Sequence, residues 1–227
     1  MTFSSPRLAA FSALMTVFAV PSCVDRTLLQ TEASIDMTST AYAEKPMTTP
    51  AEAMEVVAFW REAGPSMWFA KDDAFDTRFR TRFLVRHEAA ARGELKSWEQ
   101  TSDGVLALIL LLDQFPRNAF RGTPRMYATD AMARDVADRA ILAGLDKSVD
   151  PQIRTFVYLP FGHSENLADQ ERSVALSRTL GETNLRHAQR HHDIVARFSR
   201  FPHRNPILGR AMRPEEQDYL DQGGYAG

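Results

Sequence analysis

Apolar residues follow a helical period along most of the chain after residue 46. Between 71 and 92, Phe75, Phe79 and Phe83 recur at four-residue spacing with arginines and aspartates between them, which places the three rings on one helix face. The run from Val105 to Leu112 is apolar on almost every side, so the segment 104–115 is expected to be the core helix. No segment shows convincing alternation with period two, and the sequence therefore predicts an all-α protein.

Proline and glycine divide this pattern into seven to eight helices. Gly64 and Pro65 end the first helix, and Pro116 is expected to break the core helix. Pro160 is expected to lie just beyond a later helix end. The expected helices span about 50–63, 71–92, 104–115, 129–143, 151–159, 164–180 and 183–198, with a short one from 214. Helices of this length joined by short loops are expected to form antiparallel helical hairpins stacked in layers.

The first 46 residues lack this helical period. Arg7 precedes a mostly apolar stretch, 8–20, and Cys23 follows shortly after it, which is the layout of an export signal. The alternatives are a non-structural extension or an upstream start codon chosen in error. We expect residues 1–46 to be a disordered extension or signal segment, 47–221 a single helical domain and 222–227 a frayed tail. A cytoplasmic location is favoured, with export or lipid anchoring through Cys23 as the alternative.

The composition fits a globular domain with no charge-driven partner. The chain has 227 residues, of which 44% are hydrophobic, and its 27 basic and 29 acidic side chains give a formal charge of −2. A net charge close to zero argues against a nucleic-acid-binding or membrane-binding surface. The domain also lacks an apolar run of roughly 18 residues, so we expect no integral membrane span in it.

Polar and rigid residues gather at three places where helices end. The three segments are 112–122, 158–165 and 197–210, and each combines a proline with charged or imidazole side chains. They contain Leu-Asp-Gln-Phe-Pro-Arg-Asn at 112–118, Pro-Phe-Gly-His-Ser-Glu at 160–165, and Arg-Phe-Ser-Arg-Phe-Pro-His-Arg-Asn at 197–205.

These runs resemble the hallmarks of the bacterial family catalogued as domain of unknown function 924. The likeness covers about 56–220 and rests on three long motifs in the family's order. It implies a helical fold similar to tetratricopeptide-type superhelices, and no established activity. The sequence departs from the family pattern at Ser199, where glycine is expected, and at 211–213, where versions containing Ser and Thr are usual.

Arginine is the side chain that the three segments share. Its planar guanidinium suits a carboxylate or a phosphate, so convergence of the segments would create an anion-binding site. The alternative is that these residues form buried ion pairs that tie helix ends together. The candidate binding residues are Asp113, Arg117, Asn118, Arg121, Glu165, Arg200, Arg204, Asn205 and Arg210.

Histidine supplies the candidates for proton transfer. His163 and His203 lie in polar turns, where a side chain with an ordinary pKa of about 6.5 can act as acid or base. His187 and His191 share a helix face as two metal ligands could, but Ile194 continues that face, so both are expected to be packing residues. We therefore expect no metal and no cofactor, and Ser164 is expected to cap a helix rather than to act as a nucleophile.

Two functions stay open from the sequence. The first is a helical binding module whose Arg- and His-lined site holds an anionic peptide or small molecule. The second is a metal-independent hydrolase or transferase, with His163 or His203 as acid or base and with Arg117 and Arg204 binding an anionic substrate. An enzyme needs an enclosed pocket with a titratable group near the reacting atom, whereas a binding module can use an open groove.

Overall fold

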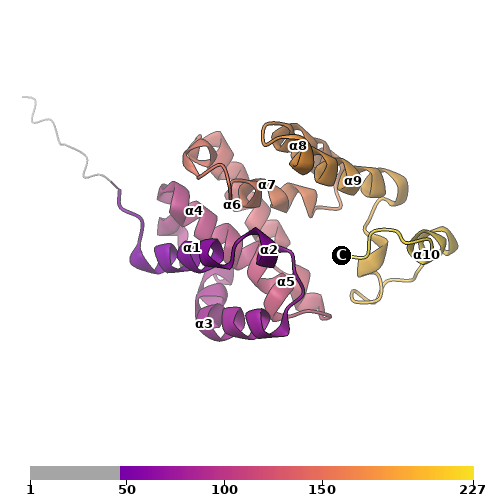
Figure 1. Ribbon diagram of the computed structural model, residues 1–227, viewed down its shortest axis with the longest axis horizontal. Helices are drawn as coiled ribbons and strands as arrows, with labels where there is room; N and C mark the ends of the chain where they lie inside the picture. The colour runs from indigo at the N-terminus through magenta and orange to yellow at the C-terminus, as the bar shows by residue number, and fades with distance from the viewer. Residues whose placement is uncertain (1–46) are drawn as a thin grey trace, which may run out of the picture. The chain divides into compact units, whose positions relative to one another are not determined.

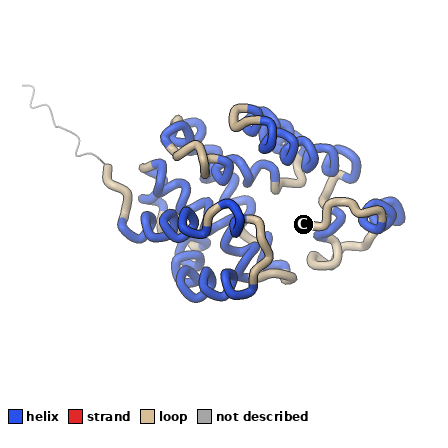
Figure 2. The backbone as a smooth tube through the Cα atoms, in the orientation of Figure 1, coloured by secondary structure: helices blue, strands red, loops and turns tan. Residues whose placement is uncertain are grey.

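The computed structural model describes residues 47–227, and every regular element among them is helical (Figures 1 and 2). The expected export signal with Cys23, like all of 1–46, lies outside the described residues. The α-helices are α1 (Ala51–Ala63), α2 (Pro65–Trp68), α3 (Asp73–Ala91), α4 (Ser102–Ile109), α5 (Phe115–Ala119), α6 (Asp130–Leu142), α7 (Thr155–Gly162), α8 (Leu167–Arg178), α9 (Glu182–Phe198) and α10 (Pro214–Asp221). Shorter helical turns are η1 (Lys96–Gln100), η2 (Leu110–Gln114), η3 (Pro124–Tyr127), η4 (Leu145–Ser148) and η5 (Pro202–Arg204). The predicted all-α class is confirmed.

From α6 to α9 each helix packs on the next one along the chain, whereas α1 and α3 pack on helices that are further away in sequence. α4 contacts α1 on one side and α6 on another, α6 contacts α7, and α7, α8 and α9 follow as successive packed pairs (Figure 1). α3 instead packs against α5. This packing brings together the ends of α5, α7 and α9, where the polar turns considered below lie.

The aromatic stripe predicted on α3 forms the centre of the core. Phe75, Phe79 and Phe83 are all buried, and their ring centroids lie 5.2 to 5.3 Å from that of Phe59 on α1. Trp60 extends the stack with an edge-on contact of 5.2 Å to Phe156 on α7. Aromatic pairs at these distances contribute about 0.5 to 1.5 kcal/mol beyond the burial of their area. The stripe therefore connects the first helices of the chain to α7.

The core helix continues past Pro116, where the sequence predicts a break. α4 runs into η2, a π-helical turn, and then into α5. Pro116 has no N–H group, so it cannot donate to the carbonyl of Leu111 or Leu112, its partners at π and α spacing. Nδ1 of His87 lies 2.9 Å from the Leu111 oxygen, and Oγ1 of Thr129 donates to the Leu112 oxygen. Because other side chains satisfy both carbonyls, the helix passes through the proline instead of ending.

Two further helix boundaries differ from the expectation. α7 passes through Pro160 and ends at Gly162. α8 begins at Leu167, and its N-cap is Asn166, whose side-chain oxygen accepts from the backbone of Ala168 at 2.8 Å. Ser164 is not that cap, and its hydroxyl donates to Asp169 at 2.6 Å. The residues between α7 and α8 thus form a separate turn that carries His163.

Ser199 ends α9 in a left-handed conformation. Its φ is +59°, which makes it the one residue other than glycine with positive φ among the described residues. Glycine is the residue expected here from the family resemblance, and a residue with a Cβ costs about 1 kcal/mol in this region. The reversal at Ser199 directs the chain from α9 into η5.

Candidate functional site

Asp113 and His163 form the centre of a polar cluster. Asp113 lies on the π-helical turn η2 with its side chain fully buried, and His163 follows the last residue of α7. Nδ1 of His163 is 2.8 Å from Oδ1 of Asp113, and the Gln114 amide donates to the other oxygen at 2.7 Å. Burial opposes ionisation of Asp113, but the charge of Arg117 and the bond to His163 hold its pKa well below the usual range. Asp113 is therefore a carboxylate at neutral pH.

His163 is a neutral imidazole with a defined tautomer. Burial lowers its pKa, and the nearby charge of Arg117 lowers it further. Because Asp113 is ionised and accepts, Nδ1 of His163 carries the hydrogen. Nε2 has no hydrogen-bond partner in residues 47–227 and is not fully buried. Its lone pair can accept a proton or a hydrogen bond from a ligand.

Arg117 bridges two carboxylates from different elements. Its guanidinium lies 3.3 Å from Oδ1 of Asp113 and makes two bonds to Asp130 on α6, at 2.8 and 2.9 Å. Burial would lower the pKa of Arg117, but these carboxylates raise it. Both oxygens of Asp130 are engaged by this bidentate pair, which is the strongest geometry for an arginine and a carboxylate.

Arg204 is buried without a close partner. It is only 7% exposed, and its nearest carboxylate oxygen, on Asp130, is 3.8 Å away. Its guanidinium makes no hydrogen bond within the described part of the chain, and its Nε is fully buried. The rings of Tyr127 and Phe201 lie 4.6 and 4.5 Å from the guanidinium carbon. Burial lowers the pKa of Arg204, and the charge of Arg117 lowers it further. Cation–π attraction to the two rings offsets part of the free-energy cost of burying this charge.

Two more imidazoles and a tyrosine surround this cation. Burial and the charge of Arg204 lower the pKa of His203 to about 4, and burial together with His163 lowers that of His191 to about 3. Nδ1 of His203 is buried and has no partner in residues 47–227. The ring of Tyr225 lies 4.9 Å from His191 and 5.2 Å from His203. Although the sequence predicts fraying over 222–227, Tyr225 also donates its backbone N–H to Tyr219 at 2.9 Å.

Asn118 and Arg121 belong to a different contact. The Asn118 amide donates to Asp76 on α3 at 2.7 Å, and Arg121 forms a bidentate pair with the same carboxylate. These bonds hold α5 against α3. The structure does not place either residue beside Asp113 and His163, so both act as a clamp between helices.

Ion pairs and hydrogen bonds around η5 involve Glu165, Arg200, Asn205 and Arg210. Arg210 makes two bonds to Glu165, at 2.6 and 2.9 Å, and Glu165 also accepts the backbone N–H of Phe201. Asn205 accepts from Arg210 at 2.9 Å and donates to the buried Glu216, which also binds Arg200 at 2.6 and 2.7 Å. These four predicted residues hold the turn that carries His203 and Arg204, and each of their charged groups already has an oppositely charged partner.

The three segments with these residues match a family model described as "Bacterial protein of unknown function (DUF924)" over residues 56–224. The chain belongs to this family. The solved structure of the protein of unknown function ATU0120 from Agrobacterium tumefaciens is 54% identical to this chain, with a TM-score of 0.75 over 76% of this chain and 98% of that one. No curated protein matches the chain in sequence. The resemblance inferred from the motifs is confirmed, and the comparisons supply a fold without an activity.

Three residues of the cluster in this DUF924 chain, Tyr127, Asp130 and Tyr225, were not predicted from the sequence, and a fourth, His191, was expected to be a packing residue. Asp130 follows Thr129 at a helix start, where a carboxylate is ordinarily explained by the helix dipole. His191 shares a face with apolar residues, and Tyr225 lies in a segment expected to fray. Tyr127 lies on η3, just after the first polar segment. Only the tertiary structure brings these four beside Arg117 and Arg204.

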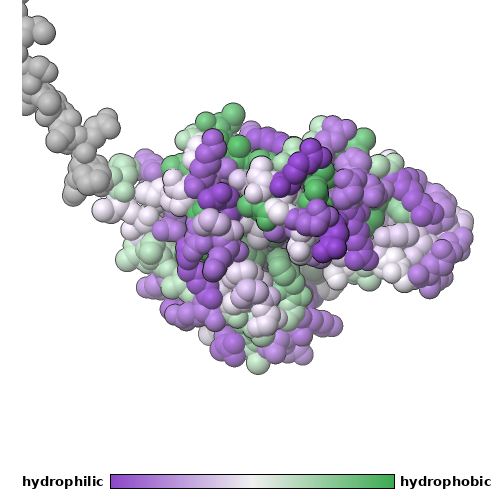
Figure 3. All heavy atoms as spheres, turned by 45° about the horizontal axis from the view of Figure 1, so that its top comes forward, coloured by the Kyte–Doolittle hydropathy of each residue, from purple (hydrophilic) through white to green (hydrophobic). Residues whose placement is uncertain are grey.

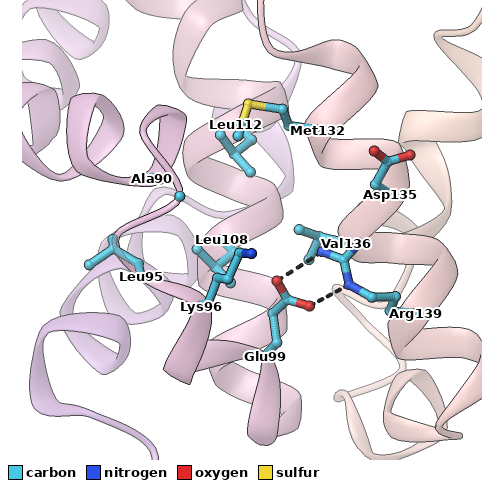
Figure 4. Close-up of a pocket in the computed structure, with 11 residues that line it drawn as sticks. Ala90, Leu95, Lys96, Glu99, Leu108, Leu112, Met132, Asp135, Val136 and Arg139 are labelled. Atoms are coloured by element: carbon cyan, nitrogen blue, oxygen red, sulfur yellow. Dashed lines mark hydrogen bonds and ion pairs between the residues drawn. The ribbon is translucent and has the colours of Figure 1, made fainter.

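A separate cleft lies between α4 and α6, away from the cluster. It has a volume of about 100 Å³, with Leu108, Leu112 and Val136 on its walls and the Glu99–Arg139 ion pair across it (Figure 4). Ligand pockets usually enclose about 300 to 1,000 Å³, so this cleft is too small for an organic ligand. None of the predicted site residues lines it.

Within residues 47–227, no group of three or more His, Cys, Asp or Glu side chains is placed to hold a metal ion. Over the same residues, no helix has both the length and the apolar character that crossing a membrane requires.

Proposed function

We propose that this DUF924 protein is a binding module that holds an anionic small molecule, or the carboxylate of a peptide, at Arg204. The observation that carries the proposal is a buried arginine whose Nε is fully buried without an acceptor and whose guanidinium makes no hydrogen bond among residues 47–227. An isolated buried charge costs several kcal/mol unless a partner compensates it. A carboxylate or phosphate presents two oxygens to the arginine fork and would supply that compensation.

The surrounding groups favour an anion over a cation or a neutral ligand. Both oxygens of Asp130 are engaged by Arg117, so the one carboxylate within 4.0 Å of Arg204 among residues 47–227 is already neutralised. His163, His191 and His203 add no negative charge, and the free Nε2 of His163 offers a further polar contact. Tyr127 and Phe201 hold the guanidinium in place, which reduces the entropy lost when a ligand binds.

A thermal-shift titration with inorganic phosphate, acetate and glutarate tests the proposal. The parent protein, Arg204→Met and Arg61→Met are compared at fixed salt, since arginine–anion attraction is screened. Arg61 is an exposed arginine paired with Asp150, so its variant removes the same charge elsewhere. We expect a concentration-dependent rise in Tm for the parent and for Arg61→Met, and no rise for Arg204→Met. Equal shifts in all three proteins, or no shift in the parent, would contradict the proposal.

The Asp113–His163 pair favours a second candidate function, metal-independent hydrolase or transferase chemistry. A carboxylate that orients Nδ1–H of a neutral histidine leaves Nε2 as a general base, and Arg204 lies nearby to hold an anionic substrate. Activity against a panel of carboxylate and phosphate esters should rise with pH as His163 loses its proton, and His163→Gln should abolish it. The exposed His187→Gln serves as control. Turnover that survives His163→Gln excludes this role for His163.

A further inference from the structure

A second groove runs along α9 beside α10, apart from Arg204. It has a volume of about 390 Å³ and is lined by three arginines of α9, Arg186, Arg190 and Arg197, with Ile194, Phe198 and Tyr219 as its apolar part. In Figure 3, hydrophilic side chains cover most of the face that carries α8 and α9, and hydrophobic ones show between them. The groove thus combines cationic edges with an apolar floor.

The three arginines have no ionic partner among residues 47–227. None of them lies within 4.0 Å of a carboxylate oxygen in the described part of the chain, although most arginines of this domain do form such pairs. The only acidic side chain in the lining is Asp193, which accepts from Gln189 at 2.8 Å and lies 3.1 Å from His192. The groove therefore carries a net positive charge on a protein whose formal charge is −2.

Aromatic rings contact two of these arginines, and one of the rings, that of Tyr225, lies outside the groove lining. The guanidinium carbon of Arg197 lies 4.6 Å from the Phe198 ring and 5.7 Å from the Tyr219 ring, and that of Arg190 lies 5.1 Å from Tyr225. Stacking of this kind limits side-chain freedom, so less entropy is lost when an acidic group binds. Arg190 and Arg197 are therefore preorganised for contact with a partner.

The spacing of the charges indicates an extended ligand. Arg186 and Arg197 are 11 positions apart on α9, which corresponds to roughly 16 Å along a helix axis. An extended peptide covers that distance with about five residues. We propose that this groove binds an acidic peptide segment, with carboxylates on the arginines and one apolar side chain on Ile194, Phe198 and Tyr219. The near-neutral charge of the whole chain disfavours a nucleic acid, which requires a broad basic surface.

Fluorescence anisotropy with defined probes tests this proposal. The probe is a dye-labelled nonapeptide with glutamates on both sides of a central phenylalanine. It is titrated with the full chain, with Arg186→Gln/Arg197→Gln, and with the control Arg78→Gln/Arg82→Gln. The control pair lies on α3, is exposed, stacks on aromatic rings and has no ion pair within the described residues, which matches the tested pair.

We expect the parent protein to bind the probe saturably, with an affinity that falls as salt is added. Arg186→Gln/Arg197→Gln should bind the probe about 5-fold or more weakly, because two exposed ion pairs are lost. The control variant should bind as the parent does, and replacing the probe's phenylalanine by alanine should weaken binding. The proposal is overturned by no binding up to about 1 mM protein, or by equal binding to the groove variant. Equal or tighter binding of a lysine-for-glutamate probe, of oligothymidylate or of phosphatidylglycerol vesicles overturns it as well. Arg204 is outside the groove, so these outcomes do not decide the proposed anion site.

Discussion

Nδ1 of His163 lies 2.8 Å from Oδ1 of Asp113, although the two residues are 50 positions apart in the chain. The pair joins the turn after α7 to the π-helical turn of the core helix. It sets the tautomer of His163 and leaves Nε2 unpaired among the described residues. Asp113 thereby acts on stability, through Arg117 and His163, and on the chemistry that His163 can perform.

Replacing Asp113 by asparagine should destabilise the fold by about 3 kcal/mol or more. The substitution removes the negative charge of the fully buried Asp113 and leaves Arg117 and His163 facing a neutral amide in place of their shared carboxylate. Urea denaturation measures the loss, and Asp138→Asn, which breaks the exposed pair with Arg172, provides the control. A loss similar to that of the control would show that Asp113 contributes little to stability.

The two buried arginines should respond oppositely to replacement by methionine. Arg117→Met strands the carboxylates of Asp113 and Asp130 and should cost about 3 to 5 kcal/mol. Arg204→Met removes a buried cation without a close partner, so the free energy of unfolding should stay unchanged or rise. Denaturation curves of both variants give the sign of each change in the free energy of unfolding. A loss of several kcal/mol in Arg204→Met would instead identify Arg204 as a structural residue.

Stability should fall as the pH drops from about 6.5 to about 4. Burial lowers the folded-state pKa of His163 and His87, and lowers that of His191 to about 3 and His203 to about 4. The unfolded chain therefore binds more protons in this window, and the stabilisation is complete only above the ordinary histidine pKa. Denaturant titrations from pH 7.5 to 4.5 should show this slope, and His191→Gln should reduce it. An unchanged slope in His191→Gln would contradict the assignment.

The carbonyl groups that lose a backbone N–H donor at Pro116 provide a further test of how the core helix is stabilised. Thr129→Val keeps the side-chain shape but removes the hydroxyl that donates to the Leu112 oxygen, and should cost about 1 to 3 kcal/mol. Thr129→Ser retains the donor and should recover most of that loss. Chemical denaturation of the two variants makes the comparison. Equal stability of the serine and valine variants would show that the hydroxyl is not needed.

The sequence alone was enough to predict the helical class and the family. The four-residue spacing of Phe75, Phe79 and Phe83 predicts a buried helix face, because period and burial are coupled locally. The same local logic failed at Pro116 and Pro160, where a proline ordinarily ends a helix. His87 and Thr129 change that outcome at Pro116, and both are distant enough in sequence that no local rule includes them.

The partners of the charged residues were decided only by the tertiary structure. The sequence identified Arg117, Arg121, Arg200, Arg204 and Arg210 as one chemical group, yet Arg121 pairs with Asp76, Arg210 with Glu165 and Arg200 with Glu216. Arg204 alone of these five is left without a close carboxylate within residues 47–227. Helical periodicity is encoded between neighbours a few positions apart, so a sequence displays it. An ion pair depends on where the packing of whole helices brings two chain segments together, and only the folded chain determines which arginine keeps its donors free.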